Sequence, residues 1–451
     1  MRLGVLILCL AAALAGCRVG PNYHRPNVHP PPQFRDGEPN PTQASLGNVK
    51  WFDLFQDDVL RGLIKQALVA NYDILIAAQR VIAAQGQFIA TRSTLYPRLD
   101  GESSVSRSNI AAPVQSQSDV LAILSWEADL FGRLRRATEA ARADALAAEE
   151  NQETVIQTLI AQVASAYFNL RELDAELEIV RESIKFRQES VALTTAREQG
   201  GVASMVDVDM ATSLVQTAQS DAIVLEKTRT ETENLISFLL GRPPGPVARG
   251  LSLVDQPQPA EVPAGLPSSL LERRPDLRAA EQEMVAANAR VGVAKAAYFP
   301  SLNLTAAGGA QTSDLARVAN GGAYSALGIL DVPIVDFGRR RGNYQTAKAD
   351  SQAFVLNYLN VANGAFRDVS NALIDHQKSK EFAASQKALT DTLRDQTRLA
   401  NARYAGGATS YLEVLDSERQ RLTAEQLLVR ARRDVLIALV QLYQALGGGW
   451  Q

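Results

Sequence analysis

Hydrophobic residues recur at helical spacing through long stretches of the chain that contain no proline. In the first of these stretches an apolar residue returns every seven positions, and another usually follows three positions later. This is the a/d seam of a coiled coil, so the pattern predicts a long helix over 132–199 and a second over 204–240. The Gly200-Gly201 pair predicts that the chain folds back between them. The seven-residue positions are Ile156, Val163, Leu170, Leu177 and Ile184.

Two shorter segments alternate apolar and polar residues instead, at about 97–127 and 300–335. Each is expected to form a β-hairpin with one apolar and one polar face, because side chains on a strand alternate between the two faces. Strands of about ten residues with this pattern are typical of a transmembrane β-barrel with a wet interior, although a half-buried hairpin alternates in the same way. The apolar face is expected to carry Leu99, Gly101, Ser103, Val105, Val120, Ala122, Leu124, Trp126, Leu302, Leu304, Ala306, Gly328, Leu330, Val332 and Ile334.

The sequence is one structural unit written twice. Tyr96-Pro97-Arg98-Leu99 returns 203 positions later as Phe299-Pro300-Ser301-Leu302, and Phe131-Gly132-Arg133 returns 206 positions later as Phe337-Gly338-Arg339. Such self-similarity indicates two copies of one supersecondary arrangement. We expect repeat 1 over 51–242, a Pro/Gly-rich linker over 243–267, and repeat 2 over 268–451 with its long helices over 339–405 and 410–446.

The composition excludes several classes of protein. With 46 Lys and Arg against 49 Asp and Glu the formal net charge is −3, so the chain has no signature of nucleic-acid binding. Two cysteines and three histidines leave little material for a metal site or a disulfide framework. No nucleophile-base or paired-carboxylate pattern occurs at a usable spacing, so we expect no enzyme activity, no cofactor and no bound metal.

The N-terminus predicts secretion and lipid attachment. Residues 1–16 read as a secretory signal, with Arg2 as the charged start and an apolar run too short to span a membrane. Leu14-Ala15-Gly16-Cys17 resembles the bacterial lipoprotein cleavage box, in which the cysteine is acylated, with palmitate as an expected chain. Cys17 is therefore expected to anchor an extended leader over 17–50 to a bilayer. A plain signal peptide with a chance cysteine is the alternative.

Two hairpins supply four strands per chain, and four strands cannot close a barrel. An open sheet edge in lipid leaves backbone groups without partners, and an eight-stranded barrel from two chains is filled by its own side chains. Three chains give twelve strands and a lumen wide enough for solutes. The predicted fold class is therefore mainly α with transmembrane β: a homotrimeric, twelve-stranded barrel continued by a long α-helical coiled-coil barrel.

Three arginines stand at the start of each very long helix, just after the strands. Cations oppose the macrodipole at a helix N-terminus, so another interaction must favour them. We expect contact with anionic headgroups of the inner leaflet of the membrane. A solvated charge run without a partner is the alternative. These residues are Arg133, Arg135, Arg136, Arg339, Arg340 and Arg341.

Four motifs carry a resemblance to a known family. They are the segment from Cys17 to Tyr23, the WFDLF motif at Trp51, the DLFGR motif at Asp129 and the C-terminal LYQALGGGW at Leu442. Together they resemble the TolC-like outer-membrane efflux proteins, in the lipoprotein branch of OprM or NodT type, over the whole mature chain. The resemblance implies a trimer in the outer membrane of a Gram-negative bacterium that extends into the periplasm. It also implies two partners, a periplasmic adaptor and an inner-membrane pump.

The function implied by the resemblance is that of a passive export duct. The adaptor would open it, and the pump, usually a proton-driven one of RND type for drugs or toxic compounds, would supply the energy. Service to a metal-efflux or a type I protein secretion system stays open. A periplasmic coiled-coil tether that conducts nothing is the alternative from a different class.

The resemblance also implies a gate at the periplasmic end of the helical tunnel. Leu412 resembles an apolar ring residue, Asp416 an acidic ring residue, and Arg419 and Tyr404 the residues that tether neighbouring helices. Asp207 matches a position that accepts such a tether. Glu413 lies in the same segment. The helix-terminating turns are expected to contact the adaptor, and they contain Gly200, Gly201, Gly406 and Gly407.

Overall fold

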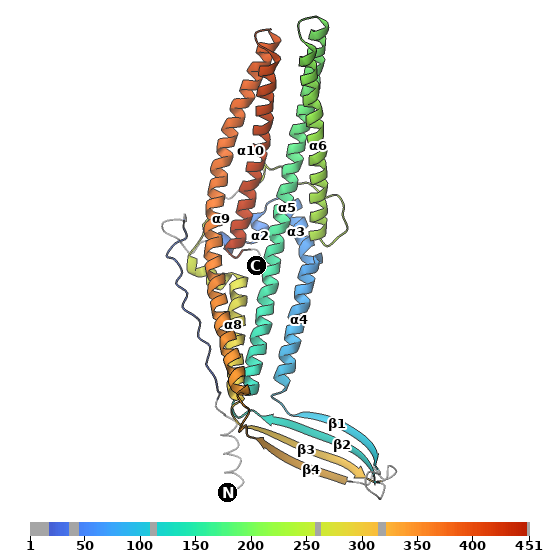
Figure 1. Ribbon diagram of the computed structural model, residues 1–451, viewed down its shortest axis with the longest axis vertical. Coiled ribbons are helices and arrows are strands. Elements are labelled where there is room, and N and C mark those ends of the chain that lie inside the picture. Colours follow the sequence, from blue (N-terminus) through green and yellow to red (C-terminus); the bar gives the residue numbers. More distant parts are fainter. Residues whose placement is uncertain (1–17, 36–44, 109–114, 258–262, 314–321, 449–451) are drawn as a thin grey trace. The chain divides into compact units, whose positions relative to one another are not determined.

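The chain divides into two compact units in the computed structural model, and Figure 1 gives the order of its elements. The predicted signal segment and Cys17 lie outside the described residues. The first unit contains Met1–Val28, Ala78–Asn151 and Asp276–Ala362, and the second contains His29–Ala77, Gln152–Pro275 and Asn363–Gln451. The structure describes residues 18–35, 45–108, 115–257, 263–313 and 322–448.

The longer helices come in matched pairs. α4 (Tyr72–Ser93) and α8 (Pro275–Ala296) have 22 residues each, and α8 begins and ends 203 positions after α4. α5 (Arg133–Gln199) and α9 (Arg339–Ala405) have 67 residues each, and here the shift is 206 positions. These shifts equal the offsets of the repeated sequence motifs. The internal tandem repeat is therefore confirmed.

Each very long helix folds back on a shorter one, as Figure 1 shows for the α5–α6 and α9–α10 hairpins. α6 (Met205–Leu239) and α10 (Tyr411–Ala445) have 35 residues each and are again 206 positions apart. The seam residue Leu177 of α5 shares a buried cluster with Ala218 and Ala222 of α6. Small residues on one helix let the two axes approach closely, as expected of an antiparallel coiled-coil pair.

Shorter helices form the segment that precedes the first strand of each repeat. In repeat 1 the segment forms α2 (Trp51–Leu54), α3 (Asp58–Ala70) and then α4. Asn71 separates α3 from α4, because its backbone is extended and its side-chain oxygen accepts a hydrogen bond of 2.8 Å from the amide of Asp73. The remaining short helices are η1 (Leu46–Asn48), η2 (Pro267–Ser269) and α7 (Leu270–Arg273).

One antiparallel sheet of four strands lies in the first unit. Its strands pair in chain order, so β1 and β4 are the edges of the sheet in a single chain. The register places Leu99, Leu124, Ala306 and Ala326 in one row across the four strands. Paired residues share a face, so the predicted apolar positions within the strands lie on one face. The strands are β1 (Arg98–Ser108), β2 (Gln115–Ala128), β3 (Ser301–Thr312) and β4 (Gly322–Asp331).

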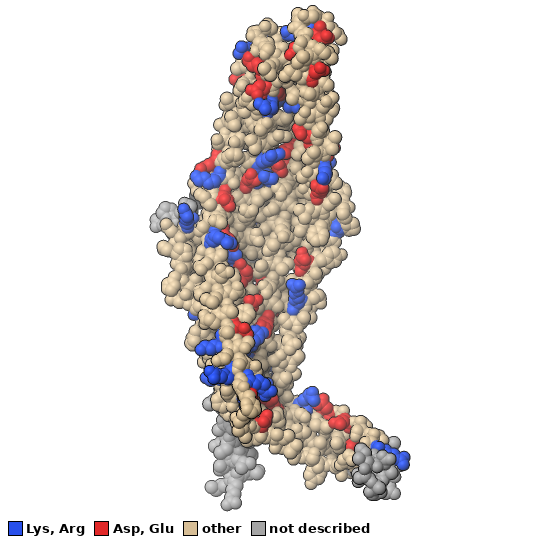
Figure 2. Space-filling model, viewed as in Figure 1, with Lys and Arg blue, Asp and Glu red and all other residues tan. Residues whose placement is uncertain are grey.

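The face of the sheet visible in Figure 2 is largely uncharged, with charged side chains along one edge and at the tip. One part of the strand prediction is wrong, because β4 ends at Asp331 and neither Val332 nor Ile334 belongs to it. Pro333 explains the early end, since proline has no N–H to donate to a ladder.

Candidate gate and strand-helix junction

The turns that close the two hairpins are built on glycine. Gly201 and Gly407 have φ of 73° and 75°, the left-handed region that costs glycine nothing. In the first turn the amide of Val202 donates to the carbonyl of Arg197 (2.9 Å), and in the second Ala408 donates to Arg403 (2.9 Å). These bonds satisfy the last helical carbonyls, so the glycines end the helices. Contact of the turns with an adaptor stays a prediction.

Arg197 joins the two hairpins near their turns. Its guanidinium carbon lies 4.6 Å from the ring centroid of Tyr404, and its Nη1 donates to the Tyr404 carbonyl over 3.3 Å. The Tyr404 side chain is buried and its ring lies 5.3 Å from that of Tyr411, in a cluster that also contains Ala211 and Val414. The predicted tether residue Tyr404 thus contacts Arg197 of repeat 1. Arg197 was not identified as a gate residue from the sequence.

The repeat counterpart of Arg197 is Arg403, and it does something different. Arg403 pairs with Glu413 inside its own turn, at 3.2 Å. Asp207, the counterpart of Glu413, forms a capping box with Ser204 at the start of α6, where the Ser204 amide donates to the carboxylate over 3.0 Å. Asp207 is therefore satisfied locally. Its predicted role as acceptor of a tether stays a prediction.

The predicted ring residues lie on the exposed surface of α10. Leu412 is 62% exposed, and it is one of many large apolar side chains that are exposed in the described chain, so its exposure alone does not single it out. Asp416 pairs with Arg419 one turn later, at 3.0 Å, and also accepts from Gln420. This pair joins neighbours on one helix and does not tether two helices within the chain. The ring assignments stay predictions.

Further along the helices from the turns, ion pairs of buried carboxylates hold α5 and α10 together. Glu176 of α5 is 1% exposed and accepts from Arg430 Nε at 2.6 Å, while Glu172 is 5% exposed and lies 3.4 Å from Arg433 Nη1. Burial, and then the negative charge of Glu176, raise the pKa of Glu172 to about 7, although Arg433 opposes the shift. Glu172 therefore binds a proton more tightly in the folded chain than in the unfolded one.

This cluster predicts a pH dependence of stability. A carboxyl whose pKa is raised by folding stabilises the folded state less as pH rises, so stability should fall between about pH 4.5 and pH 7. The Glu172→Gln variant should lose most of this dependence and melt a few degrees higher than wild type at pH 8. Melting temperatures of both proteins in detergent across that range test the prediction. Parallel curves for the two proteins would contradict it.

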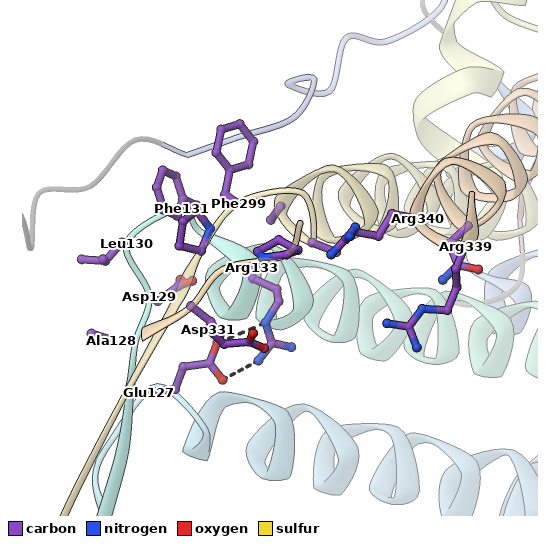
Figure 3. Close-up of a pocket in the computed structure, with 16 residues that line it drawn as sticks. Glu127, Ala128, Asp129, Leu130, Phe131, Arg133, Phe299, Asp331, Arg339 and Arg340 are labelled. Atoms are coloured by element: carbon purple, nitrogen blue, oxygen red, sulfur yellow. Dashed lines mark hydrogen bonds and ion pairs between the residues drawn. The ribbon is translucent and has the colours of Figure 1, made fainter. Parts of the chain in front are cut away.

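At the junction between strands and helices, carboxylates of the same chain pair with most of the six arginines that were predicted to contact headgroups. Arg133 pairs with Glu127 at 2.5 Å, and Asp331 lies beside this pair in a cavity of about 380 Å³ (Figure 3). Asp129 accepts from the backbone amide of Arg135 at 2.9 Å and from its side chain at 3.1 Å. These acidic groups also favour the helix N-terminus, which explains why cations are tolerated there.

Repeat 2 has a similar arrangement at the start of α9, although its aspartate precedes the paired arginine by four positions and not by six. Asp336 accepts from the backbone amide of Arg340 at 3.0 Å and from its Nε at 2.8 Å. The hydrogen bond from the Arg340 amide, and then the one from the Gly338 amide and the positive charge of Arg340, keep the pKa of Asp336 below its usual value. Arg339 and Arg341 are exposed. Headgroup contact thus stays a prediction for them.

The prediction that Arg136 contacts headgroups is wrong. Its side chain is 1% exposed and donates to Asn22 Oδ1 and to Glu139 Oε2, both at 2.9 Å. Asn22 belongs to the leader, whose Gly20 lies so close to Gly292 that an added Cβ would be 2.5 Å from the Gly292 Cα. Arg136 therefore holds the leader against α5 and α8, and these contacts bury its side chain.

Sequence comparison now identifies the family. The profile described as Outer membrane efflux protein matches residues 63–242 and 266–448. The chain belongs to this family. The two matches correspond to the two repeats, and the predicted linker lies between them.

Relatives of the outer membrane efflux protein family cover almost the whole chain. The cation efflux system protein CusC of Escherichia coli is 34% identical over 455 residues, covering 99% of both chains. The toluene efflux pump outer membrane protein TtgF of Pseudomonas putida is also 34% identical and covers 100% of this chain and 98% of its own. The solved open-state MtrE outer membrane channel of Neisseria gonorrhoeae has a TM-score of 0.88 and 30% identity, covering 96% of this chain and 99% of MtrE.

These comparisons settle the class of protein. The chain is an outer-membrane protein of an efflux channel family, mainly helical with four antiparallel strands, and the family is one of transporters rather than enzymes. Within the described residues, no group of three or more His, Cys, Asp or Glu side chains is placed to hold a metal ion.

Proposed function

We propose that three copies of this chain form a passive outer-membrane duct for export. The sheet carries the proposal, because its four strands have one apolar face and two open edges, β1 and β4. In lipid such edges require partners, and three chains close them with twelve strands around a lumen. The long α5–α6 and α9–α10 hairpins would continue the lumen into the periplasm. A periplasmic adaptor would open the end near Tyr404, and an inner-membrane pump would supply the energy.

The cargo is proposed to be drugs or other toxic organic compounds, moved by an RND-type pump. TtgF, whose name states toluene efflux, supports this class. Cation efflux is the second candidate, because CusC is equally similar. Acylation of Cys17 is proposed on the cleavage box alone, and it would hold the leader at the membrane.

Exchange of outer-membrane channels in cells tests the proposal. The gene replaces the native channel in one strain that depends on a drug pump and in another that depends on a copper or silver pump. We expect restored resistance to organic toxins in the first strain. Restored resistance to metal ions alone would favour cation efflux, and restoration of neither, with correctly inserted protein, would contradict the duct.

A further inference from the structure

A cavity of about 560 Å³ lies in the first unit and is lined by residues of α4, α5, α8 and α9. Small-molecule sites have volumes of about 300–1,000 Å³, so this cavity is large enough to hold an organic compound. Alanines make up much of its wall, and their small side chains leave the space open. They are Ala137, Ala140, Ala141, Ala294 and Ala297. The charged residues of the wall are Arg133, Asp144, Arg290 and Arg340.

The charge of this wall differs from that of the smaller cavity in Figure 3. Arg133 and Arg340 line both cavities, so the two adjoin. In the smaller cavity three acidic residues balance three arginines. In the wall described for the larger cavity, Asp144 alone stands against three arginines, so its formal charge is +2. The larger cavity therefore favours an anion.

The ion pairs of these arginines leave N–H groups over. Arg133 donates to Glu127 through Nε and Nη2. Arg290 donates to Asp144 through Nη2, and Arg340 pairs with its aspartate through Nε. A guanidinium has five N–H donors, so each arginine keeps donors that no residue in the described ranges accepts. Carboxylate and phosphate groups match such donors well, and a sulfonate offers oxygens of the same kind.

The N-terminal leader indicates the side of α8 on which the cavity opens. Gly20 of the leader lies directly against Gly292 of α8. Arg290 and Ala294 are each two residues from Gly292, which is about 200° around the helix, so both point away from the leader. A leader held to the membrane by an acylated Cys17 would run along the outside of the tunnel. The cavity on the opposite side of α8 would then face the lumen.

We propose that this cavity binds an organic anion with an apolar body while the anion passes through the duct. Arg133, Arg290 and Arg340 hold the anionic group, and the apolar body lies against the alanines. The site rests on the duct of the proposed function, and it narrows the cargo to organic compounds that carry negative charge. Taurocholate has both features, because it joins a sulfonate to a steroid body. A bare metal cation would be repelled by the excess of arginine.

Equilibrium dialysis of radiolabelled taurocholate tests the site. The full-length protein is placed in lipid nanodiscs, and binding to empty nanodiscs is subtracted. We expect the wild type to bind taurocholate and the Arg290→Gln variant to bind it roughly tenfold more weakly, because a charge-assisted hydrogen bond is lost. The Arg290 side chain is 48% exposed, and glutamine can still donate to Asp144, so the fold should be kept.

Two further variants separate the cavity from its charge. Arg142→Gln is the matched control, since Arg142 is exposed on α5 but lies nine residues after Arg133, on the opposite side of the helix. This control should bind taurocholate as the wild type does. Ala294→Leu fills the cavity and keeps every arginine. It should weaken binding several-fold, because the steroid body loses its space.

The other outcomes separate this site from the duct. Wild-type binding no greater than that of empty nanodiscs, or equal weakening by Arg290→Gln and Arg142→Gln, would overturn the site. Conductance of the same wild-type protein in planar bilayers reports on the duct independently, so a conducting protein that binds no taurocholate leaves the duct standing. Phospholipid that mass spectrometry finds on the wild type but not on Arg290→Gln would place this face against the bilayer and overturn the proposal. Taurocholate binding in trimers that never conduct would overturn the duct and the position of the site in a lumen.

Discussion

Replacing Arg197 with alanine is expected to leave the channel partly open at rest. Arg197 connects the α5–α6 hairpin to the α9–α10 hairpin through the ring and the carbonyl of Tyr404. A cation–π contact with a hydrogen bond is worth about 1–3 kcal/mol, which corresponds to a shift of roughly 5-fold to 150-fold in the ratio of closed to open states. For cells that make the variant, the inhibitory concentration of a bulky antibiotic that intact outer membranes exclude should be several-fold lower than for cells that make the wild type.

The repeat supplies a matched control for this prediction. Arg403 is the counterpart of Arg197, but its partner Glu413 lies in the same turn. Arg403→Ala should therefore leave antibiotic entry at the wild-type level. Equal entry in the two variants would mean that loss of a charge near the turn, and not the link between hairpins, controls opening.

The Asp57→Ala variant is expected to lose about 3 kcal/mol of stability, because several buried donors lose their acceptor at once. Asp57 is 1% exposed and precedes α3. Its carboxylate accepts from the Tyr167 hydroxyl (2.8 Å), the Gln256 amide side chain (2.8 Å) and the Leu251 backbone (2.9 Å). Gly250 gives it room, since an added Cβ would lie 2.1 Å from the carboxylate.

Melting temperature in detergent measures this loss. The neighbouring residue is a suitable control, because the Asp58 side chain is 94% exposed and its ion pair with Arg61 should contribute little. We expect Asp57→Ala to melt several degrees below wild type and Asp58→Ala to melt close to it. Similar melting temperatures for the two variants would show that the buried network does not stabilise the fold.

Sequence reasoning predicted the repeated elements well because they depend on local periodicity. The seam through Val163, Leu170 and Leu177 lies on buried positions, and the alternation around Leu124 gives the apolar face of the sheet. The prediction extended the last strand too far, to Ile334, because the alternation continues there although Pro333 ends the strand.

Contacts between distant segments could not be predicted in the same way. Arg197 lies 207 positions from Tyr404, and Arg136 lies 114 positions from Asn22. No spacing rule connects such residues, because packing of separate elements brings them together. The carboxylates that pair with the arginines at the helix starts were easier to predict, because Asp129 and Asp336 lie only a few positions before those arginines in the sequence.

Single-channel conductance in planar bilayers tests the central claim, that trimers of this chain form a pore held closed near the α9–α10 turn. The measurement compares wild type with the Asp416→Ala/Arg419→Ala variant. We expect a small wild-type conductance that rises several-fold in the variant, because an exposed acidic ring residue and its partner are removed from the constriction. No conductance from well-folded trimers of either protein would contradict the account and favour a tether that conducts nothing.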